Sequence, residues 1–248
     1  MSMKENIQII KVTDAAALAQ TAAEYFARAA AENITQRGRF TVALSGGSTP
    51  KAMFALLAAE PFCSQIDWAK VFFFWGDERC VPPDHPDSNY RMTSEALLSK
   101  VNIPEENVFR MHGELDPAEA AKKYAETLLD FFQAAPVFDL VFLGMGADGH
   151  TASLFPGTSA LQAPADKIVV GNYVEKLNTT RLTLTAETIN MAKDLVFLVA
   201  GADKATALHS VLEGEYLPEI FPSQLIQPKN ATLKWMVDEA AAAKLSQN

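Results

Sequence analysis

Four apolar residues run directly into a glycine-rich polar segment in Asp139-Leu-Val-Phe-Leu-Gly-Met-Gly-Ala-Asp-Gly-His150. A second run of this kind, Val71-Phe-Phe-Phe-Trp75, ends at Gly76 and the charged residues after it. Both runs are apolar at every position, so neither face of the strands that they predict can lie against water. Strands of this kind are typical of a parallel sheet with helices on both faces.

The rest of the chain alternates short β-rich runs with longer helical patterns. Predicted strands cover 7–12, 40–44, 71–75, 140–143, 167–170, 181–185, 195–200 and 234–237. Predicted helices cover 15–33, 50–59, 89–98, 117–132, 186–191 and 204–212, with an Ala-rich helix at the C-terminus. No linker, repeat or low-complexity segment interrupts this pattern. The sequence therefore predicts one Rossmann-like α/β domain over residues 1–248, with a largely parallel sheet, mixed edge strands and helices on both faces.

Composition and net charge exclude several classes of protein. Apolar residues make up 49% of the 248 residues and charged residues 21%, enough apolar surface for a large core and too much for a disordered chain. A net charge of −9 argues against nucleic acid or an anionic membrane as the main partner. Two cysteines are too few for a disulfide scaffold, and no stretch reads as a signal peptide or a bilayer span. We therefore expect a cytoplasmic protein.

Ligands of parallel sheets bind outside the carboxyl ends of the strands, so the loops after the strands are the candidate sites. The first is Ser45-Gly-Gly-Ser-Thr-Pro50, where Thr49 is a candidate helix cap and Pro50 suits the first helical position. A glycine turn opening a helix is a common anion site, because free backbone N–H groups point at the ligand. The alternative is an ordinary turn with a cap. The segment lacks the Gly-Lys-Ser/Thr of a Walker loop.

The second loop follows Trp75 and begins Gly76-Asp-Glu-Arg79. Arg79 can bind a phosphate through two parallel hydrogen bonds. Asp77 and Glu78 can orient the Arg79 side chain or contact sugar hydroxyls. The alternative is a surface ion pair beside a proline-rich loop. His85, farther along, is predicted to be a loop residue without a catalytic role.

The third loop, Gly144 to Gly149, fits the dinucleotide pattern G-x-G-x-x-G, but Pro156-Gly157 ends any helix after about two turns. Asp148 and His150 favour another interpretation, because a carboxylate can orient an imidazole as a general base near neutral pH. A lone histidine more often has a structural role, which is the prediction for His112 and His209. The glycine-rich setting at a strand end favours catalysis for His150.

Lys204 follows Gly201 at the start of a predicted helix, where its charge is opposite to the one that the helix dipole favours. A bound anion would explain this position. The alternative is a solvated surface lysine.

Together these segments resemble the glucosamine-6-phosphate isomerase/6-phosphogluconolactonase family. The matching pieces, in order, are LSGGSTP (44–50), GDERCVPPDHPDSNY (76–90), DLVFLGMGADGHTASLFPG (139–157), RLTLT (181–185), GADKA (201–205) and QLIQP (224–228). The resemblance implies an α/β domain that hydrolyses 6-phospho-D-glucono-1,5-lactone to 6-phosphogluconate in the oxidative pentose phosphate pathway. It implies a phosphorylated sugar lactone as substrate, and neither a cofactor nor a metal.

The resemblance also implies roles for individual residues. It makes His150 the base that activates water and Asp148 the group that orients it. It assigns the substrate, chiefly its phosphate, to Gly46, Gly47, Ser48, Thr49, Asp77, Arg79, Arg181 and Lys204. Direct attack by water is favoured, because the sequence has no serine nucleophile elbow and no histidine pair with zinc-ligand spacing.

Two alternatives stay open. Deaminases of the same family carry Asp-Glu-Tyr where this chain has Asp77-Glu78-Arg79, and a catalytic glutamate where it has Phe155. Both departures argue against deaminase chemistry. A sugar-phosphate sensor domain of a transcription regulator needs a DNA-binding helix-turn-helix, and the short segment before residue 44 carries no basic patch. The sequence is compatible with a monomer or a homodimer.

Overall fold

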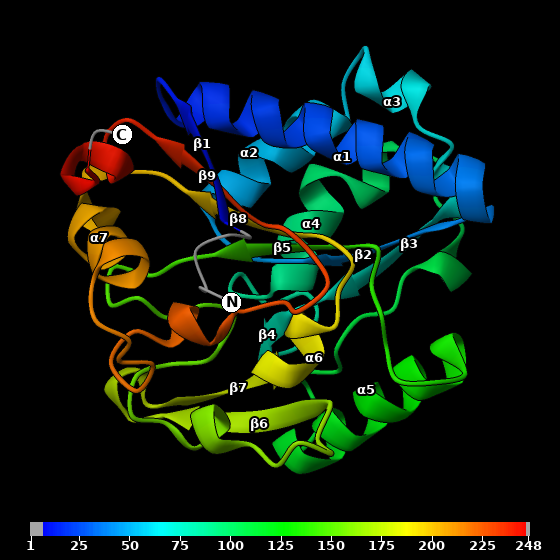
Figure 1. Cartoon of the computed structure of the whole chain (residues 1–248). Coiled ribbons are helices and arrows are strands. Elements are labelled where there is room, and N and C mark those ends of the chain that lie inside the picture. The colour runs from blue at the N-terminus through cyan, green and yellow to red at the C-terminus, as the bar shows by residue number, and fades with distance from the viewer. Residues whose placement is uncertain (1–6, 247–248) are drawn as a thin grey trace.

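A computed structural model describes residues 7–246 of the chain, and its centre is a six-stranded sheet. Every neighbouring pair in this sheet is parallel. The strand order is β1 (Ile7–Val12), β9 (Leu233–Asp238), β8 (Leu195–Val199), β5 (Leu140–Gly144), β2 (Phe40–Leu44) and β3 (Val71–Trp75). Figure 1 shows the sheet in the middle layer, with α1 (Ala15–Arg37) above it and α5 (Pro117–Phe132) below. The predicted α/β class is confirmed.

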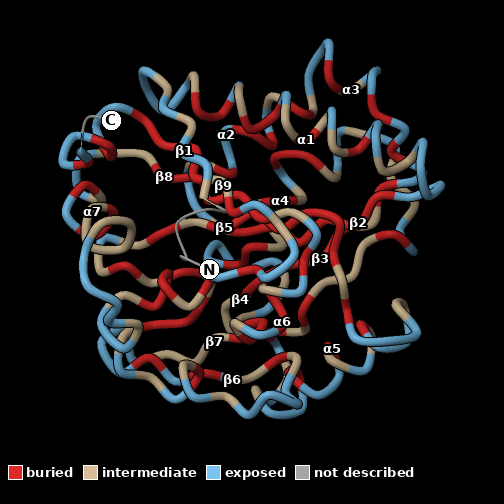
Figure 2. The backbone as a smooth tube through the Cα atoms, in the orientation of Figure 1, coloured by how far each residue is buried: buried red, intermediate tan, exposed pale blue. Residues whose placement is uncertain are grey.

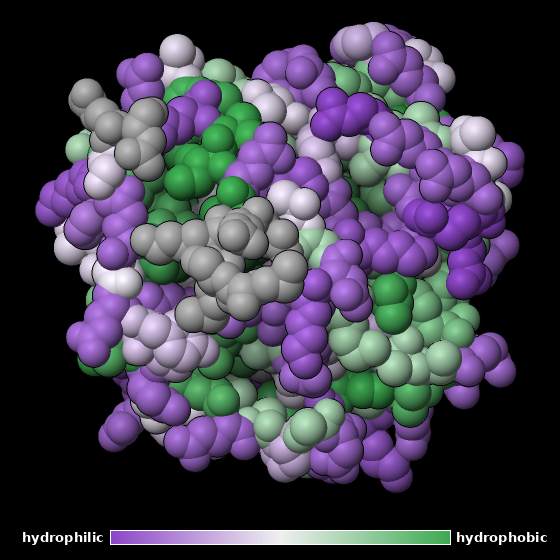
Figure 3. Space-filling view, in the orientation of Figure 1, coloured by the Kyte–Doolittle hydropathy of each residue, from purple (hydrophilic) through white to green (hydrophobic). Residues whose placement is uncertain are grey.

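Side chains of one strand alternate between two hydrophobic cores. Leu140 and Phe142 of β5 pack in the core that contains Phe26 of α1. Val141 and Leu143 pack in the core that contains Tyr124 of α5 and its neighbours. Both faces of the strand are therefore buried, which explains why its residues 140–143 are all apolar. Figure 2 shows the inner strands β2, β5 and β8 largely as buried, whereas the edge strand β1 is partly exposed. The outer surface differs: hydrophilic residues dominate the face seen in Figure 3.

Both long helices begin where their sequences predict, but α1 continues to Arg37, four residues beyond the predicted end at residue 33. The Asp14 carboxylate accepts the backbone N–H of Ala17 at 2.8 Å, which caps α1, and Gly38 ends that helix in the left-handed region at a φ of 75°. Asp116 caps α5 in the same way, and Pro117 occupies the first helical position. The predicted bounds of α5 agree with the structure at both ends.

The antiparallel strands form a separate sheet instead of extending the edges of the main one. Its order is β4 (Asp77–Arg79), β7 (Thr179–Leu184) and β6 (Val169–Val174). The sequence predicts a loop at residues 77–79 and mixed strands at the edges of the main sheet, and the structure differs on both points. Three polar residues give no strand pattern of their own, and they become a strand because β7 pairs with them.

The remaining helices are α2 (Ser48–Leu57), α3 (Phe62–Gln65), α4 (Asn89–Ala96), α6 (Ala186–Asn190) and α7 (Ala205–Glu213). The prediction that Thr49 caps α2 is wrong: Gly47, at a φ of 112°, is the N-cap, so the helix begins earlier. The predicted C-terminal helix is only a 3₁₀ turn at Ala241–Lys244. None of the helices within residues 7–246 has the length and hydropathy of a membrane span.

The strand order creates a switch point between β2 and β5. These strands are neighbours, but the chain continues from β2 to β3 on one side of the sheet centre and from β5 to β8 on the other. The loops after the two strands therefore diverge and leave a crevice at their carboxyl ends, the usual ligand position in a sheet of this type.

Candidate active site

A cleft with a volume of about 390 Å³ lies at this switch point. The loops after β2 and β5 form one part of its wall, and the small antiparallel sheet forms another. Its lining is Ser45, Gly46, Gly47, Asp77, Arg79, Asn89, Gly144, Met145, Gly146, His150, Ala152, Ser153, Phe155, Lys176, Leu177, Arg181 and Lys204.

The loop after β5 places an aspartate–histidine pair at the cleft. His150 Nδ1 lies 2.5 Å from Asp148 Oδ1, and the backbone N–H of His150 donates to the same oxygen at 3.2 Å. A Cβ at Gly146 would lie 2.1 Å from His150 Nδ1, so a side chain there would displace the ring. The hydrogen bond to Asp148 orients the imidazole and leaves Nε2 as the nitrogen available to water.

The environment keeps His150 neutral at pH 7. Burial lowers the pKa of His150 to about 4, the positive charges of Lys204 and Arg181 act in the same direction, and Asp77 opposes them. A neutral imidazole can accept a proton, so the charge state suits a general base.

An aromatic ring and a lysine complete the surroundings of the imidazole. The Phe155 ring stacks on His150 with 4.0 Å between centroids and 22° between planes. Lys176 Nζ forms an ion pair with Asp148 Oδ2 and lies 4.9 Å from the Phe155 ring centroid. Lys176 is not among the residues that the sequence predicts for the site, because the turn between β6 and β7 carries no recognisable motif.

Two arginines face each other across the small sheet. Arg79 of β4 and Arg181 of β7 are direct partners in the antiparallel ladder. Arg79 Nη1 donates to the Asp87 carbonyl, but the Nε atoms of both arginines are buried without a hydrogen-bond partner in residues 7–246. Burial and the charge of Arg79 lower the pKa of the Arg181 guanidinium. Like charges placed opposite each other repel, so an anion bound between them would be stabilising.

Asp77 lies beside this pair with its side chain held in place. Its Oδ2 accepts the Ser153 hydroxyl at 2.7 Å, and its backbone carbonyl accepts Asn89 Nδ2 at 2.9 Å. Asn89 Oδ1 is buried and has no partner in the described part of the chain. A Cβ at Gly46 would lie 1.9 Å from that oxygen, so only glycine fits there without moving Asn89.

Glu78 has a structural position, although it directly follows Asp77. Its carboxylate accepts the backbone N–H of Asn89 at 2.7 Å and of Tyr90 at 2.8 Å, and the Ser88 hydroxyl at 3.1 Å. The side chain is buried and fixes the first turn of α4, and burial raises its pKa. It does not line the cleft.

The structure brings most of the predicted site residues together. The cleft is lined by Gly46, Gly47, Asp77, Arg79, His150, Arg181 and Lys204, with Asp148 next to His150. Ser48 and Thr49 lie in the first turn of α2, outside the lining. Lys204 pairs with Asp203 at 2.9 Å while it lines the cleft. Within residues 7–246, no three His, Cys, Asp or Glu side chains converge as metal ligands do.

A protein-family profile described as glucosamine-6-phosphate isomerases/6-phosphogluconolactonase matches residues 13–235. The chain belongs to this family. A 6-phosphogluconolactonase of Nostoc sp. is 47% identical over 218 residues, which cover 86% of this chain and 88% of that protein. The structure of 6-phosphogluconolactonase from Trypanosoma cruzi matches with a TM-score of 0.88 and 28% identity, covering 100% of this chain and 99% of that one.

The family fold also occurs in a second class of enzyme. A monomeric glucosamine-6-phosphate deaminase matches with a TM-score of 0.79 at 22% identity, covering 96% of this chain and 99% of that one. At that identity the similarity concerns the fold alone. Within the glucosamine-6-phosphate isomerase/6-phosphogluconolactonase family, the reaction must therefore be argued from the side chains of the cleft.

Proposed function

We propose that the protein hydrolyses 6-phospho-D-glucono-1,5-lactone to 6-phosphogluconate, the lactonase step of the oxidative pentose phosphate pathway, as one domain over residues 1–248. One observation carries the proposal: a neutral histidine oriented by a carboxylate shares a cleft with Arg79, Arg181 and Lys204. A base beside a concentration of positive charge suits a substrate that has a hydrolysable carbonyl at one end and a phosphate at the other.

The base acts on water. His150 Nε2 accepts a proton from a water molecule as the water oxygen attacks the lactone carbonyl. The tetrahedral intermediate then expels the ring oxygen, and the imidazolium returns the proton to it. Such acid–base work contributes ~10²–10⁴ in rate. Asp148 keeps its charge throughout and stabilises the imidazolium while it exists.

The phosphate serves as a handle and does not react. Arg79, Arg181 and Lys204 supply charge-assisted hydrogen bonds to it. Gly46 and Gly47 bring the backbone close, and Ser48 and Thr49 lie at the helix N-terminus, where N–H groups are free of intrahelical partners. Asp77 accepts a sugar hydroxyl in this arrangement. Binding energy from the phosphate then positions the carbonyl next to the water.

The contact between Phe155 and His150 favours lactone hydrolysis over deamination. A deaminase of this family would need a glutamate at residue 155 for proton transfer on the sugar. Here a phenyl ring stacks on the imidazole at 4.0 Å and can neither donate nor accept a proton. Phosphogluconolactone is therefore the better substrate than glucosamine 6-phosphate.

The same proposal places the enzyme in the cytoplasm as a monomer or homodimer, with neither nucleic acid nor membrane as a partner. Size-exclusion chromatography with light scattering distinguishes the two oligomeric states.

The test compares both substrates in parallel. Wild type should release acid from freshly made 6-phosphogluconolactone far faster than the spontaneous reaction, and should release no ammonia from glucosamine 6-phosphate. Activity should persist without any added cofactor. Rapid deamination, or lactone hydrolysis no faster than the uncatalysed rate, would refute the proposal.

A further inference from the structure

Lys176 is a cleft residue to which the proposed reaction gives no role. It lies in a 3₁₀ turn, Glu175–Leu177, that connects β6 to β7 in the small sheet. Its side chain is 51% exposed, so burial does not explain its position. Asn178 closes the turn in the left-handed region, and its Oδ1 accepts the Tyr173 hydroxyl at 2.8 Å. The turn is thus fixed by its own sheet and does not depend on the loop after β5.

The lysine contacts the same carboxylate as the histidine. Lys176 Nζ pairs with Asp148 Oδ2, while Asp148 Oδ1 accepts His150 Nδ1. A carboxylate held at both oxygens cannot rotate without breaking one of the two contacts.

The aromatic ring fixes the same geometry from a second side. Phe155 stacks on His150, and Lys176 Nζ lies 4.9 Å from the centroid of the Phe155 ring, within the range of a cation–π contact. Lys176, Asp148, His150 and Phe155 therefore form a closed set of contacts that connects the turn of the small sheet to the loop after β5.

We propose that Lys176 is a positioning residue of the base: it fixes the Asp148 carboxylate so that His150 keeps its proton on Nδ1 and presents Nε2 to water. The catalytic consequence rests on the proposed lactonase function. The geometric consequence, the tautomer of His150 in the free protein, does not.

The charges around His150 determine in which direction the pH dependence of kcat/KM should shift when the ammonium of Lys176 is removed. The charged groups that face it are Asp148 on its own loop, Asp77 on β4, Arg181 on β7, Lys204 before α7, and Lys176 through Asp148. Removing the ammonium of Lys176 leaves more of the negative charge of Asp148 acting on the ring. The imidazolium becomes easier to form, so the acid limb of kcat/KM moves to higher pH.

The experiment uses Lys176→Met, Lys176→Arg and the control Lys122→Met, which removes a lysine paired with Glu126 on α5, away from the cleft. For Lys176→Met we expect kcat to fall about tenfold, less than the loss of the base itself, with KM within about twofold. Lys176→Arg should restore most of kcat, and Lys122→Met should match wild type. Nitrogen-15 NMR of the ligand-free proteins should show the Nδ1–H tautomer in wild type and a mixture in Lys176→Met.

The outcomes separate the two proposals. A Lys176→Met protein with the wild-type tautomer and kcat overturns the positioning role, as does one in which KM alone rises, since that result makes Lys176 a substrate-binding residue. A wild type that does not hydrolyse the lactone refutes the proposed function, while the NMR comparison still decides the role of Lys176.

Discussion

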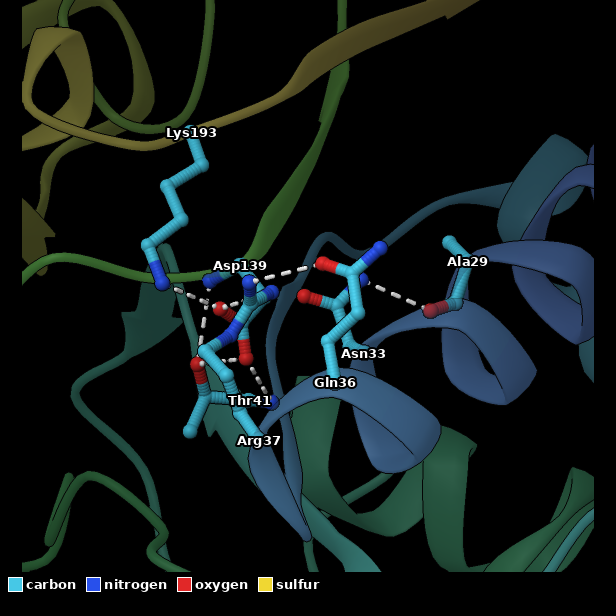
Figure 4. Close-up of polar contacts among 7 residues, drawn as sticks. All are labelled: Ala29, Asn33, Gln36, Arg37, Thr41, Asp139 and Lys193. Atoms are coloured by element: carbon cyan, nitrogen blue, oxygen red, sulfur yellow. Dashed lines mark hydrogen bonds and ion pairs between the residues drawn. The ribbon is translucent and has the colours of Figure 1, made fainter.

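The two ends of the strand pair β2–β5 differ in how the charged side chains beside them are paired. At the amino end, the buried Asp139 accepts the backbone N–H and hydroxyl of Thr41 at 2.9 and 3.0 Å, Arg37 at 3.0 Å and Lys193 at 2.9 Å (Figure 4). At the carboxyl end, Arg79 and Arg181 face each other with both Nε atoms buried and unpartnered in residues 7–246. One end satisfies its charges within the chain, and the other leaves positive charge for a ligand.

The difference shows that the groups at one end of the β2–β5 pair serve stability and the groups beside its other end serve function. A buried carboxylate with four donors stabilises the fold, because the donors replace the water that it lost. Two facing guanidinium groups repel each other in the empty protein, and an anion bound between them offsets that repulsion. Variants at the carboxyl end should therefore change kinetics, and variants at the amino end should change stability.

The largest expected effect is at His150. His150→Asn should lower kcat for lactone hydrolysis by ~10²–10⁴, because it removes the base, and should leave KM nearly unchanged, because the phosphate contacts lie on other elements. Stopped-flow measurement of acid release gives both constants. His112→Asn is the matched control, since His112 pairs with Glu114 outside the cleft and should show wild-type rates. Full activity in His150→Asn would remove the base from the mechanism.

The pH profile is the next largest effect. Only the neutral ring can accept a proton, so kcat/KM falls as the pH drops through the pKa of His150, which burial lowers to about 4. At pH 5 a ring with the ordinary pKa of 6.5 would be only about 3% neutral, whereas this one should be about 90% neutral. We expect kcat/KM to be nearly constant from pH 7 to 5. An acid limb centred near 6.5 would show that the cleft does not depress this pKa.

Arg181→Met separates binding from stability at the carboxyl end. The variant loses a charge-assisted contact worth ~1.5–3 kcal/mol, so KM should rise about 10- to 100-fold. Without ligand it should unfold at a higher temperature than wild type, because the repulsion between facing like charges, ~0.2–1 kcal/mol, is gone. Thermal denaturation without ligand measures the change in stability. The same measurement with inorganic phosphate measures the loss of anion binding, since phosphate should stabilise wild type more than the variant.

The control for this pair of effects is Arg37→Met at the amino end. Arg37 pairs with Asp139, so its loss should lower stability without changing KM. If Arg181→Met were also less stable than wild type and bound substrate normally, the two ends would not differ in the way described.

The sequence predicted the elements whose signals are local. The strands at 7–12, 40–44 and 71–75 and the helix at 117–132 agree with the structure, because apolar runs and caps such as Asp116 act over a few residues. The loops after the predicted strands at 40–44, 71–75 and 140–143 meet in the cleft as expected, since the carboxyl ends of parallel strands share one edge.

Features that depend on pairing between distant segments were not predictable in this way. Residues 77–79 are a strand only because residues 181–183 of β7 lie beside them, and the register of that pair places Arg181 opposite Arg79. Lys176 reaches Asp148 from a turn without a motif. Its role depends on the position of the small sheet, which no local pattern of residues contains.

The smallest expected effect on catalysis, and a clear one on stability, is at Asp139. Asp139→Ala leaves the backbone N–H and hydroxyl of Thr41 without their acceptor in the buried strand and removes the partner of Arg37 and Lys193, both partly exposed. We expect a loss of ~1–3 kcal/mol in unfolding free energy, or about 2–4 °C in Tm for each kcal/mol. Because the network lies at the opposite end of β2 and β5 from His150, kcat and KM at 25 °C should not change. Chemical denaturation and steady-state kinetics on one preparation decide the matter, and a changed KM with unchanged stability would mean that the amino end acts on the cleft through the strands.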